Sequence, residues 1–305
     1  MDIFDTLSYR AERPCVVALG CFDGVHIGHQ AVIKEAKLHA DKLALPLCVF
    51  TFAKPPKSYF SKEPIPQVCS IEDKFSLLEM LGVDILISVQ PSKEIFSMTA
   101  ESFVRDFLLT DLKAKHVVCG FNYTFGVGGT GNTSLLQKIC EANGATVSIC
   151  PQQKVGDVTV SSSLIRDAVS AGQMDVASGY LGRQFSITSD VISGQHLARK
   201  LGFPTVNIIP QAELVLPKNG VYVTRVMFDD QTRYGITNVG LRPTVDTHIL
   251  CAETHLFDFE GDIYGKKITV EFLKFIRAET KFPSVQAMAQ QVRLDIEAAK
   301  KYLGN

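Results

Sequence analysis

The first half of the chain alternates short hydrophobic runs with amphipathic segments. Hydrophobic runs typical of buried strands occupy residues 15–20, 47–52, 83–89, 116–120 and 146–151. Segments with the apolar spacing of helices occupy residues 29–44, 71–82, 100–112, 134–144, 161–173 and 174–182. This alternation predicts a parallel sheet that helices cover on both faces. Ligands of such folds bind beyond the carboxyl ends of the strands.

After Gly182 the pattern changes to strand-like segments, several of which alternate hydrophobic and polar residues. They occupy residues 185–194, 221–228, 233–240, 253–259 and 266–276. An antiparallel sheet or a small β-barrel is expected here. Residues 284–303 have helical periodicity, so one terminal helix should pack on the barrel. The pattern therefore predicts two domains, residues 1–182 and residues 183–305.

Composition and charge narrow the classes of partner. The 305 residues are 46% hydrophobic and 21% charged, which is ordinary for a folded globular protein. A formal net charge of -1 provides no global field that would attract nucleic acid or an anionic membrane. No stretch approaches the roughly 18 consecutive apolar residues of a membrane span, and the first residues lack the features of a signal peptide. We therefore expect neither nucleic acid nor a membrane as a partner.

The eight cysteines form no CxxC pair and have no Cys/His spacing of a zinc site. Several of them, such as Cys48 and Cys119, lie in or beside predicted strands, where a free cysteine behaves as a small buried hydrophobe. Reduced thiols are typical of a reducing compartment, so we expect a cytoplasmic protein.

A candidate phosphate site follows the first strand. The strand turns at Gly20, and a helix follows Gly28, which places backbone N–H groups and the positive end of the helix at the edge of the sheet. His26 and His29 are three residues apart and therefore face the same side of a helical first turn. Either histidine alone is more often a cap or a surface residue. Together, in this turn, they are suited to donate hydrogen bonds to phosphate oxygens and to stabilise the charge of a leaving pyrophosphate.

The motif in this turn resembles a known family. The segment GCFDGVHIGH at residues 20–29 resembles the HxGH signature of the nucleotidyltransferase superfamily. That core alone leaves pantetheine-phosphate, nicotinate and glycerol-phosphate transferases open. The longer form is similar to that of the bacterial bifunctional riboflavin kinase/FAD synthetase family, and two further segments resemble its motifs in order. They are CGFNYTFGVGGTGN at residues 119–132 and VSSSLIRDAV at residues 160–169.

The resemblance implies roles for residues of the first domain, which would be a Rossmann-like nucleotidyltransferase domain. His26, His29 and Arg166 would be catalytic, and an arginine can hold phosphate oxygens bidentately. Tyr123 and Phe125 would contact the flavin. The residues implied in nucleotide binding are Gly20, Phe22, Asp23, Gly24, Asn122, Gly126, Ser162 and Ser163.

A second constellation opens the C-terminal domain. GFPTVN at residues 202–207 resembles the GFPTAN core of riboflavin kinases. A strand after Pro204 would point Thr205 and Asn207 to the same face, where both oxygens suit Mg²⁺. Without the preceding GFP, the two would read as polar residues of an ordinary strand. The resemblance also implies that Gly194, Gly202 and Pro204 bind the nucleotide.

Three later residues complete the kinase-like constellation. By resemblance, Glu253 would be the general base that accepts the proton of the ribityl hydroxyl, a role that suits a positioned carboxylate. Arg242 and Arg277 would contact the flavin or the phosphates. For Glu253 an exposed strand position, and for Arg277 a surface ion pair, are the common alternatives.

The resemblance implies one bifunctional enzyme. Its second domain, an antiparallel β-barrel of the riboflavin kinase type, would phosphorylate riboflavin to FMN, and its first would adenylylate FMN to FAD. ATP would be the co-substrate of both steps, with Mg²⁺ neutralising its phosphates, and FMN and FAD would be products or bound ligands. The chain departs from the family pattern at Lys54, Pro55 and Ala198. These departures motivate an alternative, a flavin-binding or regulatory homologue that has lost one activity.

Overall fold

The computed structural model describes residues 1–192, 205–243 and 248–304. By its internal contacts the chain divides into two compact units. The first comprises Met1–Gln67 and Ile71–Ser162, and the second comprises Val68–Ser70 and Ser163–Asn305. The expected boundary between residues 182 and 183 stays a prediction.

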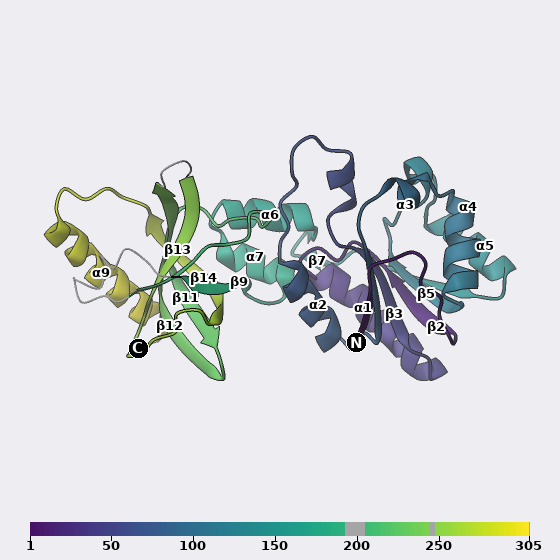
Figure 1. Ribbon diagram of the computed structural model, residues 1–305, viewed down its shortest axis with the longest axis horizontal. Helices are drawn as coiled ribbons and strands as arrows, with labels where there is room; N and C mark the ends of the chain where they lie inside the picture. The colour runs from purple at the N-terminus through teal and green to yellow at the C-terminus, as the bar shows by residue number, and fades with distance from the viewer. Residues whose placement is uncertain (193–204, 244–247, 305) are drawn as a thin grey trace. The chain divides into compact units, whose positions relative to one another are not determined.

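The first unit is built on a six-stranded sheet in which all neighbouring strands are parallel (Figure 1). The strand order is β1-β4-β3-β2-β5-β6. The bounds are β1 Asp2–Phe4, β2 Cys15–Leu19, β3 Leu47–Phe52, β4 Ile85–Val89, β5 Ala114–Gly120 and β6 Thr146–Cys150. Strand β2 is buried throughout and lies between β3 and β5, so its carboxyl end opens at the middle of the sheet edge.

Helices cover both faces of this sheet because successive strand residues point to opposite sides. Val16 and Ala18 pack with α1 (Ile27–Leu43) and α2 (Ile71–Met80). Cys15, Val17 and Leu19 pack on the other face. The segments of that face are α3 (Lys93–Ser97), α4 (Ala100–Ser102), its wider continuation η2 (Phe103–Asp111) and α5 (Thr133–Ala142).

Short elements complete this region of the chain. Turns of 3₁₀ helix lie at η1 (Pro56–Tyr59) and η3 (Val127–Gly129), and β7 (Lys154–Val155) pairs with β8 (Val158–Thr159). Helices α6 (Ser162–Ser170) and α7 (Met174–Leu181) follow. In the second unit, Lys274 donates a hydrogen bond of 2.5 Å to Asp175, and this bond joins α7 to the barrel.

The second unit contains a closed barrel of antiparallel strands, in the order β10-β13-β12-β11-β14-β9. The bounds are β9 Phe185–Ile192, β10 Thr205–Ile208, β11 Gly220–Phe228, β12 Gln231–Pro243, β13 His248–Leu256 and β14 Lys267–Ala278. Buried threonine hydroxyls form a chain inside it: Thr237 lies 2.8 Å from both Thr224 and Thr254. Hydrogen bonding between the hydroxyls compensates for their burial.

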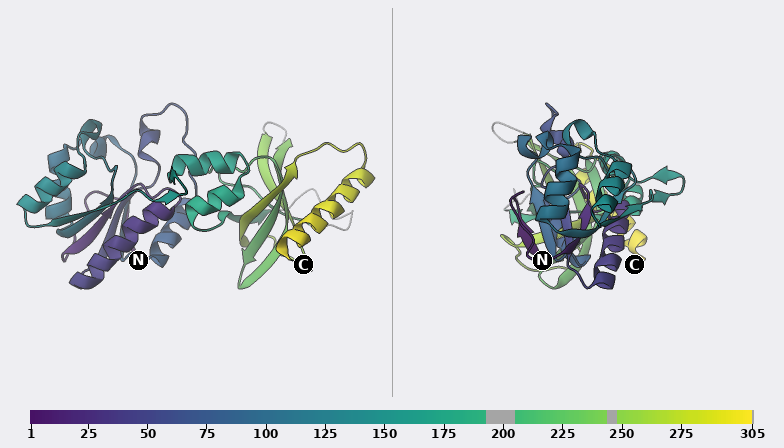
Figure 2. Two further views of the ribbon diagram at one scale, coloured as in Figure 1. Left: turned by 180° about the vertical axis from the view of Figure 1, so that it is seen from behind. Right: turned by 90° about the vertical axis from the view of Figure 1, so that its right-hand side faces the viewer.

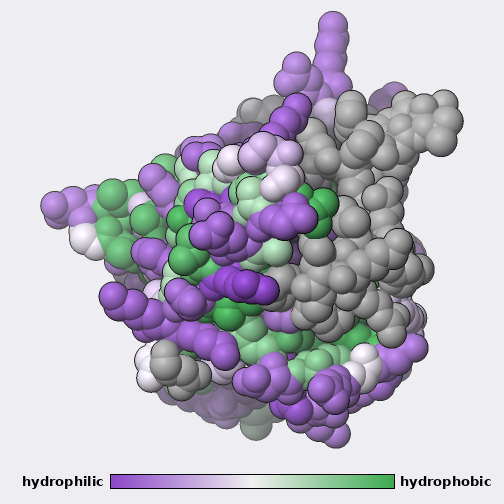
Figure 3. All heavy atoms as spheres, turned by 90° about the vertical axis from the view of Figure 1, so that its left-hand side faces the viewer, coloured by the Kyte–Doolittle hydropathy of each residue, from purple (hydrophilic) through white to green (hydrophobic). Residues whose placement is uncertain are grey.

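Helix α9 (Val285–Leu303) packs along the outside of the barrel (Figure 2). Its residues Val292, Ile296 and Ala299 contact a cluster around Val221 and Val223 of β11. The face shown in Figure 3, seen from the side on which α9 lies in Figure 1, carries mostly hydrophilic side chains. Among the helices of the described residues, none is both long and apolar enough to cross a bilayer. The predicted fold class, a parallel α/β domain followed by an antiparallel barrel with a terminal helix, is confirmed.

Candidate active sites

The backbone of the turn between β2 and α1 is constrained by close packing and by positive φ values. Phe22 is fully buried, and a Cβ atom on Gly20 would come within 2.8 Å of its ring, so only glycine fits there. Phe22 and Val25 both have positive φ values, 52° and 41°, which are uncommon for residues other than glycine. Such strained residues persist where the surrounding structure holds them in place, and they cluster at functional sites.

His26 caps helix α1. Its Nδ1 accepts hydrogen bonds from the backbone N–H groups of Gly28, at 3.1 Å, and His29, at 3.3 Å. An imidazole that accepts at Nδ1 carries its proton on Nε2. The helix cap considered from the sequence is therefore true for His26, and it is compatible with catalysis because the cap uses Nδ1 and not Nε2.

His29 stacks on His26, with ring centroids 3.5 Å apart and an interplanar angle of 18°. Its Nδ1 is buried and makes no hydrogen bond, which is rare for a buried polar atom. Burial lowers the pKa of His29 well below its usual 6.5, and the positive charges of His26 and Lys74 lower it further. The ring is therefore neutral at pH 7. A polar ligand group at this helix end would satisfy the orphaned nitrogen.

The segment before α6 reaches the same turn. Ser162 donates a hydrogen bond of 3.0 Å from its hydroxyl to the carbonyl oxygen of Asp23, and Asp23 is buried. Gly24 has a φ of 77°. Arg166 lies one helical turn after Ser162 and donates to the hydroxyl of Ser163 at 3.1 Å. The structure thus joins the first and third predicted motifs through Ser162 and Asp23.

The second predicted motif forms the loop between β5 and α5. Asn122 is exposed, whereas Phe125 is only 7% exposed and packs at 5.4 Å from Phe103. Burial raises the pKa of Tyr123. A Cβ atom on Gly126 would come within 2.6 Å of the backbone nitrogen of Ala100, so this close approach requires glycine. The flavin role of the two aromatic residues stays a prediction.

Sequence reasoning missed two features near the carboxyl end of β3. Tyr59, Phe60 and Phe96 form an aromatic cluster with centroids 4.8–5.1 Å apart, and Tyr59 and Phe60 are 45% and 70% exposed. Lys74 on α2 is 4% exposed and donates to two backbone carbonyl oxygens. The signal for Lys74 was available in the sequence, since it lies three or four residues from Ile71 and Leu78, on the apolar face of a helix.

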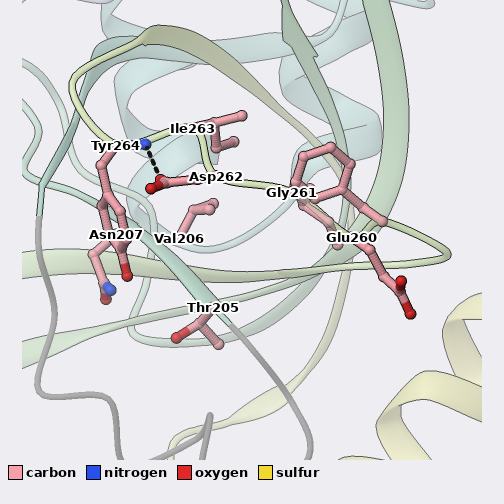
Figure 4. A pocket seen from close by; sticks show the side chains of 10 residues that line it. Thr205, Val206, Asn207, Glu260, Gly261, Asp262, Ile263 and Tyr264 are labelled. Carbon is pink, nitrogen blue, oxygen red and sulfur yellow. Dashed lines mark hydrogen bonds between the residues drawn. The ribbon is translucent and has the colours of Figure 1, made fainter.

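The barrel carries a cavity of about 520 Å³ (Figure 4). Figure 4 shows Thr205 and Asn207 on one side of β10 and Val206 on the other, as the predicted strand requires. Asn207 is buried, and Asp262 accepts a hydrogen bond of 2.9 Å from the backbone N–H of Tyr264. The cavity is lined by Thr205, Val206, Asn207, Leu256, Phe259, Glu260, Gly261, Asp262, Ile263 and Tyr264.

Glu253 lies in the same row of the barrel as Asn207. The two are directly paired between β10 and β13, and Glu253 also pairs with Asn238 of β12. Directly paired residues of neighbouring strands point to the same face of a sheet. Glu253 is partly buried. The structure therefore brings the predicted base and one predicted magnesium ligand onto one face, with Asn238 as a neighbour that the sequence did not reveal.

Arg277 has a partner within the protein. Its Nε and Nη2 donate three hydrogen bonds of 2.7–3.1 Å to Asp295 of α9, which is 2% exposed. These bonds give Arg277 a packing role between β14 and α9, and its flavin contact stays a prediction. Gly194, Ala198, Gly202, Pro204 and the side chain of Arg242 lie outside the described residues.

Two family models match the chain. The FAD synthetase model matches residues 8–164, and the riboflavin kinase model matches residues 181–303. A bifunctional riboflavin kinase/FMN adenylyltransferase from Pseudomonas fluorescens is 35% identical over 292 residues, which cover 94% of this chain and 93% of that protein. A protein of the same name from Escherichia coli (strain K12) is 32% identical over 300 residues, which cover 98% of this chain and 96% of that protein.

One solved structure resembles both units. It is called a macrolide-efflux protein from Streptococcus pneumoniae, and it has a TM-score of 0.90 and 30% sequence identity. The similarity covers 98% of this chain and 99% of that chain. The efflux activity in the name is stated of that protein alone.

These similarities and the two folds define the class of protein, an enzyme that transfers groups from ATP to flavins with two separate domains. The chain belongs to the bifunctional riboflavin kinase/FMN adenylyltransferase family. Its C-terminal domain phosphorylates riboflavin to FMN, and its N-terminal domain adenylylates FMN to FAD. Riboflavin, FMN and ATP are its substrates. The bifunctional arrangement implied by the motifs is thereby confirmed.

Proposed function

We propose that adenylyl transfer takes place at the turn between β2 and α1. An oxygen of the FMN phosphate attacks the α-phosphorus of ATP, and pyrophosphate leaves. The Nε2–H of His26 and the ring of His29 donate hydrogen bonds to phosphate oxygens, where preorganised donors stabilise developing charge. The observation that carries this assignment is the stacked histidine pair with a buried, unsatisfied Nδ1 on His29 at a helix N-terminus. The resemblance of its motif assigns Arg166 to stabilising the charge of the phosphate oxygens as well.

The flavin of this step is assigned to the exposed aromatic cluster of Tyr59, Phe60 and Phe96. Planar aromatic faces suit an isoalloxazine ring, and offset stacking of such rings is favourable. Tyr59 and Phe60 follow β3 in the sequence. The ring of Phe96 also stacks on that of Phe52, the last residue of β3, with ring centroids 5.9 Å apart. Phe125 and Tyr123 support the loop beside it by packing in the hydrophobic core.

We assign riboflavin phosphorylation to the barrel face of Thr205, Asn207 and Glu253. Glu253 accepts the proton of the ribityl 5′-hydroxyl as the hydroxyl oxygen attacks the γ-phosphorus of ATP. The oxygens of Thr205 and Asn207 would hold Mg²⁺ together with ATP phosphates, since this ion prefers hard oxygen ligands. The donor set fits, because both side chains lie on one side of β10 at a cavity that Glu260 and Asp262 also line. Bound there, Mg²⁺ would neutralise phosphate charge.

We also propose a cytoplasmic location and a boundary between the two catalytic domains near residue 182. None of the eight cysteines takes part in a disulfide, and seven of them are buried. Free, buried thiols are the usual state in a reducing compartment. The kinase family match begins at residue 181, directly before the barrel strand β9.

Two variants test the division of labour. His29→Ala should lower the rate of FAD formation from FMN by about 10²–10³-fold, the usual effect of losing one charge-stabilising donor. Glu253→Gln should abolish most riboflavin phosphorylation and leave adenylylation of added FMN within about twofold, because a lost general base costs about 10²–10⁴-fold at its own site only. Chromatography of the flavins reads both rates in one preparation. Equal losses of both activities in either variant would refute the assignment.

A further inference from the structure

Lys74 is a buried cation beside the adenylyl-transfer turn. Its side chain lies in α2 and is 4% exposed. Its Nζ donates hydrogen bonds to the carbonyl oxygens of Cys21, at 2.8 Å, and Phe52, at 2.7 Å. Burial of an ammonium group is unfavourable unless it is hydrogen-bonded. A methionine would fill the same space between α2 and the sheet without that cost, so filling space alone does not account for a lysine.

The two carbonyl groups lie at the ends of neighbouring strands. Phe52 is the last residue of β3, and Cys21 is the second residue after β2. Thr51 also donates to the Cys21 carbonyl from its hydroxyl, at 2.7 Å. Two donors on one oxygen fix the orientation of the peptide that joins Cys21 to Phe22. Lys74 therefore ties the start of the turn to the end of β3.

The orientation of this peptide determines where the following residues of the turn lie. Phe22 has a positive φ of 52°, and its carbonyl oxygen accepts a hydrogen bond of 3.1 Å from the N–H of Val25. His26 follows directly and caps α1, and its ring carries the stacked ring of His29. A change at Cys21 would thus move both histidines.

The charge of Lys74 also acts on His29. The groups that face His29 are His26 from the cap, Lys74 from α2 and the ring of Phe22 from the turn, while buried Asp23 lies in the same turn. Burial lowers the pKa of His29 most, and the charges of His26 and Lys74 add to this effect. A fixed positive charge here also favours the binding of a triphosphate.

We propose that Lys74 is a positioning residue for FMN adenylylation, which holds the Cys21 and Phe52 carbonyl oxygens and thereby sets the turn that carries His26 and His29. This inference rests on the proposed assignment of adenylyl transfer to that turn. Lys74 acts through the backbone and through its charge, and its test therefore includes readouts that a filler of space would not change.

The test compares Lys74→Met and Lys74→Arg with the wild type. Lys74→Met should lower kcat for FAD formation at least tenfold and leave riboflavin phosphorylation by the same chain within twofold. The acid-side inflection of its adenylylation rate should move to higher pH, because His29 loses a positive neighbour. Lys74→Arg, which keeps a charged donor, should recover part of the rate and the wild-type inflection. Lys37→Met, at an exposed lysine of α1 paired with Asp41, is the matched control and should change neither.

Two further variants make the outcome decisive. Thr51→Val keeps the side-chain shape and removes the second bond to the Cys21 carbonyl, so it should lower kcat in the same direction by a smaller factor, even if Lys74→Met does not fold. The proposal is overturned if Lys74→Met keeps an adenylylation rate within twofold of the wild type. It is also overturned if Lys74→Met loses tenfold in rate but shows no shift in the acid-side inflection, and Lys74→Arg recovers none of the rate. His29→Ala measured in parallel separates the two failures: if His29→Ala also retains adenylylation, the assignment of the site itself has failed.

Discussion

The ion pair between Arg277 and Asp295 joins α9 to the barrel and allows a quantitative test. Asp295 is 2% exposed and accepts hydrogen bonds of 2.7–3.1 Å from Arg277 and one of 3.0 Å from Gln291. Asp295→Asn removes the negative charge and keeps the shape. Loss of one partner of a buried pair costs about 3–5 kcal/mol. Because the Arg277 side chain keeps 23% exposure, water can solvate it in part, and we expect about 2–3 kcal/mol.

A loss of this size should lower the melting temperature of the barrel unit by about 10 °C, since about 4 °C per kcal/mol is typical of a domain of this size. Differential scanning calorimetry is the suitable assay because the chain has no tryptophan whose fluorescence would report unfolding. Asp229→Asn is the matched control. Its partner Lys266 lies at 2.7 Å, but both side chains are about half exposed, at 45% and 54%, so the loss should stay below about 0.5 kcal/mol.

The same variant separates two roles of Arg277. If Arg277 stabilises the helix, Asp295→Asn lowers the melting temperature and leaves KM for riboflavin unchanged at 20 °C. Equal melting of Asp295→Asn and the wild type would refute the reasoning that the buried pair holds α9 in place. A raised KM without a change in melting would instead support the flavin contact.

Two further predictions concern the first unit. Burial, with a smaller effect of His39, lowers the pKa of His116 to about 4, so the unfolded chain binds this proton first as the pH falls below 6.5. The free energy of unfolding should therefore decrease by up to about 3 kcal/mol between pH 6.5 and 4 because of this group. In calorimetry at a series of pH values, His116→Gln should lose stability less steeply with falling pH than the wild type. Equal pH dependence of the two proteins would contradict the prediction. Gly126→Ala should destabilise the protein by about 2–3 kcal/mol, because the position has a positive φ and the added Cβ would collide with Ala100. Gly128→Ala is the matched control: its φ is similar but the space around it is open, so it should cost about 1 kcal/mol. Equal losses of the two variants in urea unfolding would contradict the role of the contact with Ala100.

Much of the fold was predictable because it follows from local periodicity. The hydrophobic runs at residues 15–20 and 47–52 became the central strands β2 and β3, since a strand buried on both faces is apolar throughout. Strand β1 was not predicted, because Asp2–Phe4 is too short to show a period and pairs with β4, which lies more than 80 residues later in the sequence. A three-residue edge strand has little signal of its own.

The site was predictable where a motif lies within one turn of chain, as with His26 and His29. Lys74 and its partners Cys21 and Phe52 are 53 and 22 residues apart in sequence, so no local pattern joins them. The same applies to Arg277 and Asp295, which are 18 residues apart in two different elements. Pairings of this kind depend on the closed tertiary structure, and a sequence shows only that a charged residue falls on an apolar face.

The central claim is that one chain performs both flavin reactions. We would incubate the purified protein with riboflavin, ATP and Mg²⁺ and follow the flavins by chromatography over time. The account predicts that FMN appears first and FAD follows, with pyrophosphate released in step with FAD. A protein that binds flavins but forms neither FMN from riboflavin nor FAD from added FMN would contradict it.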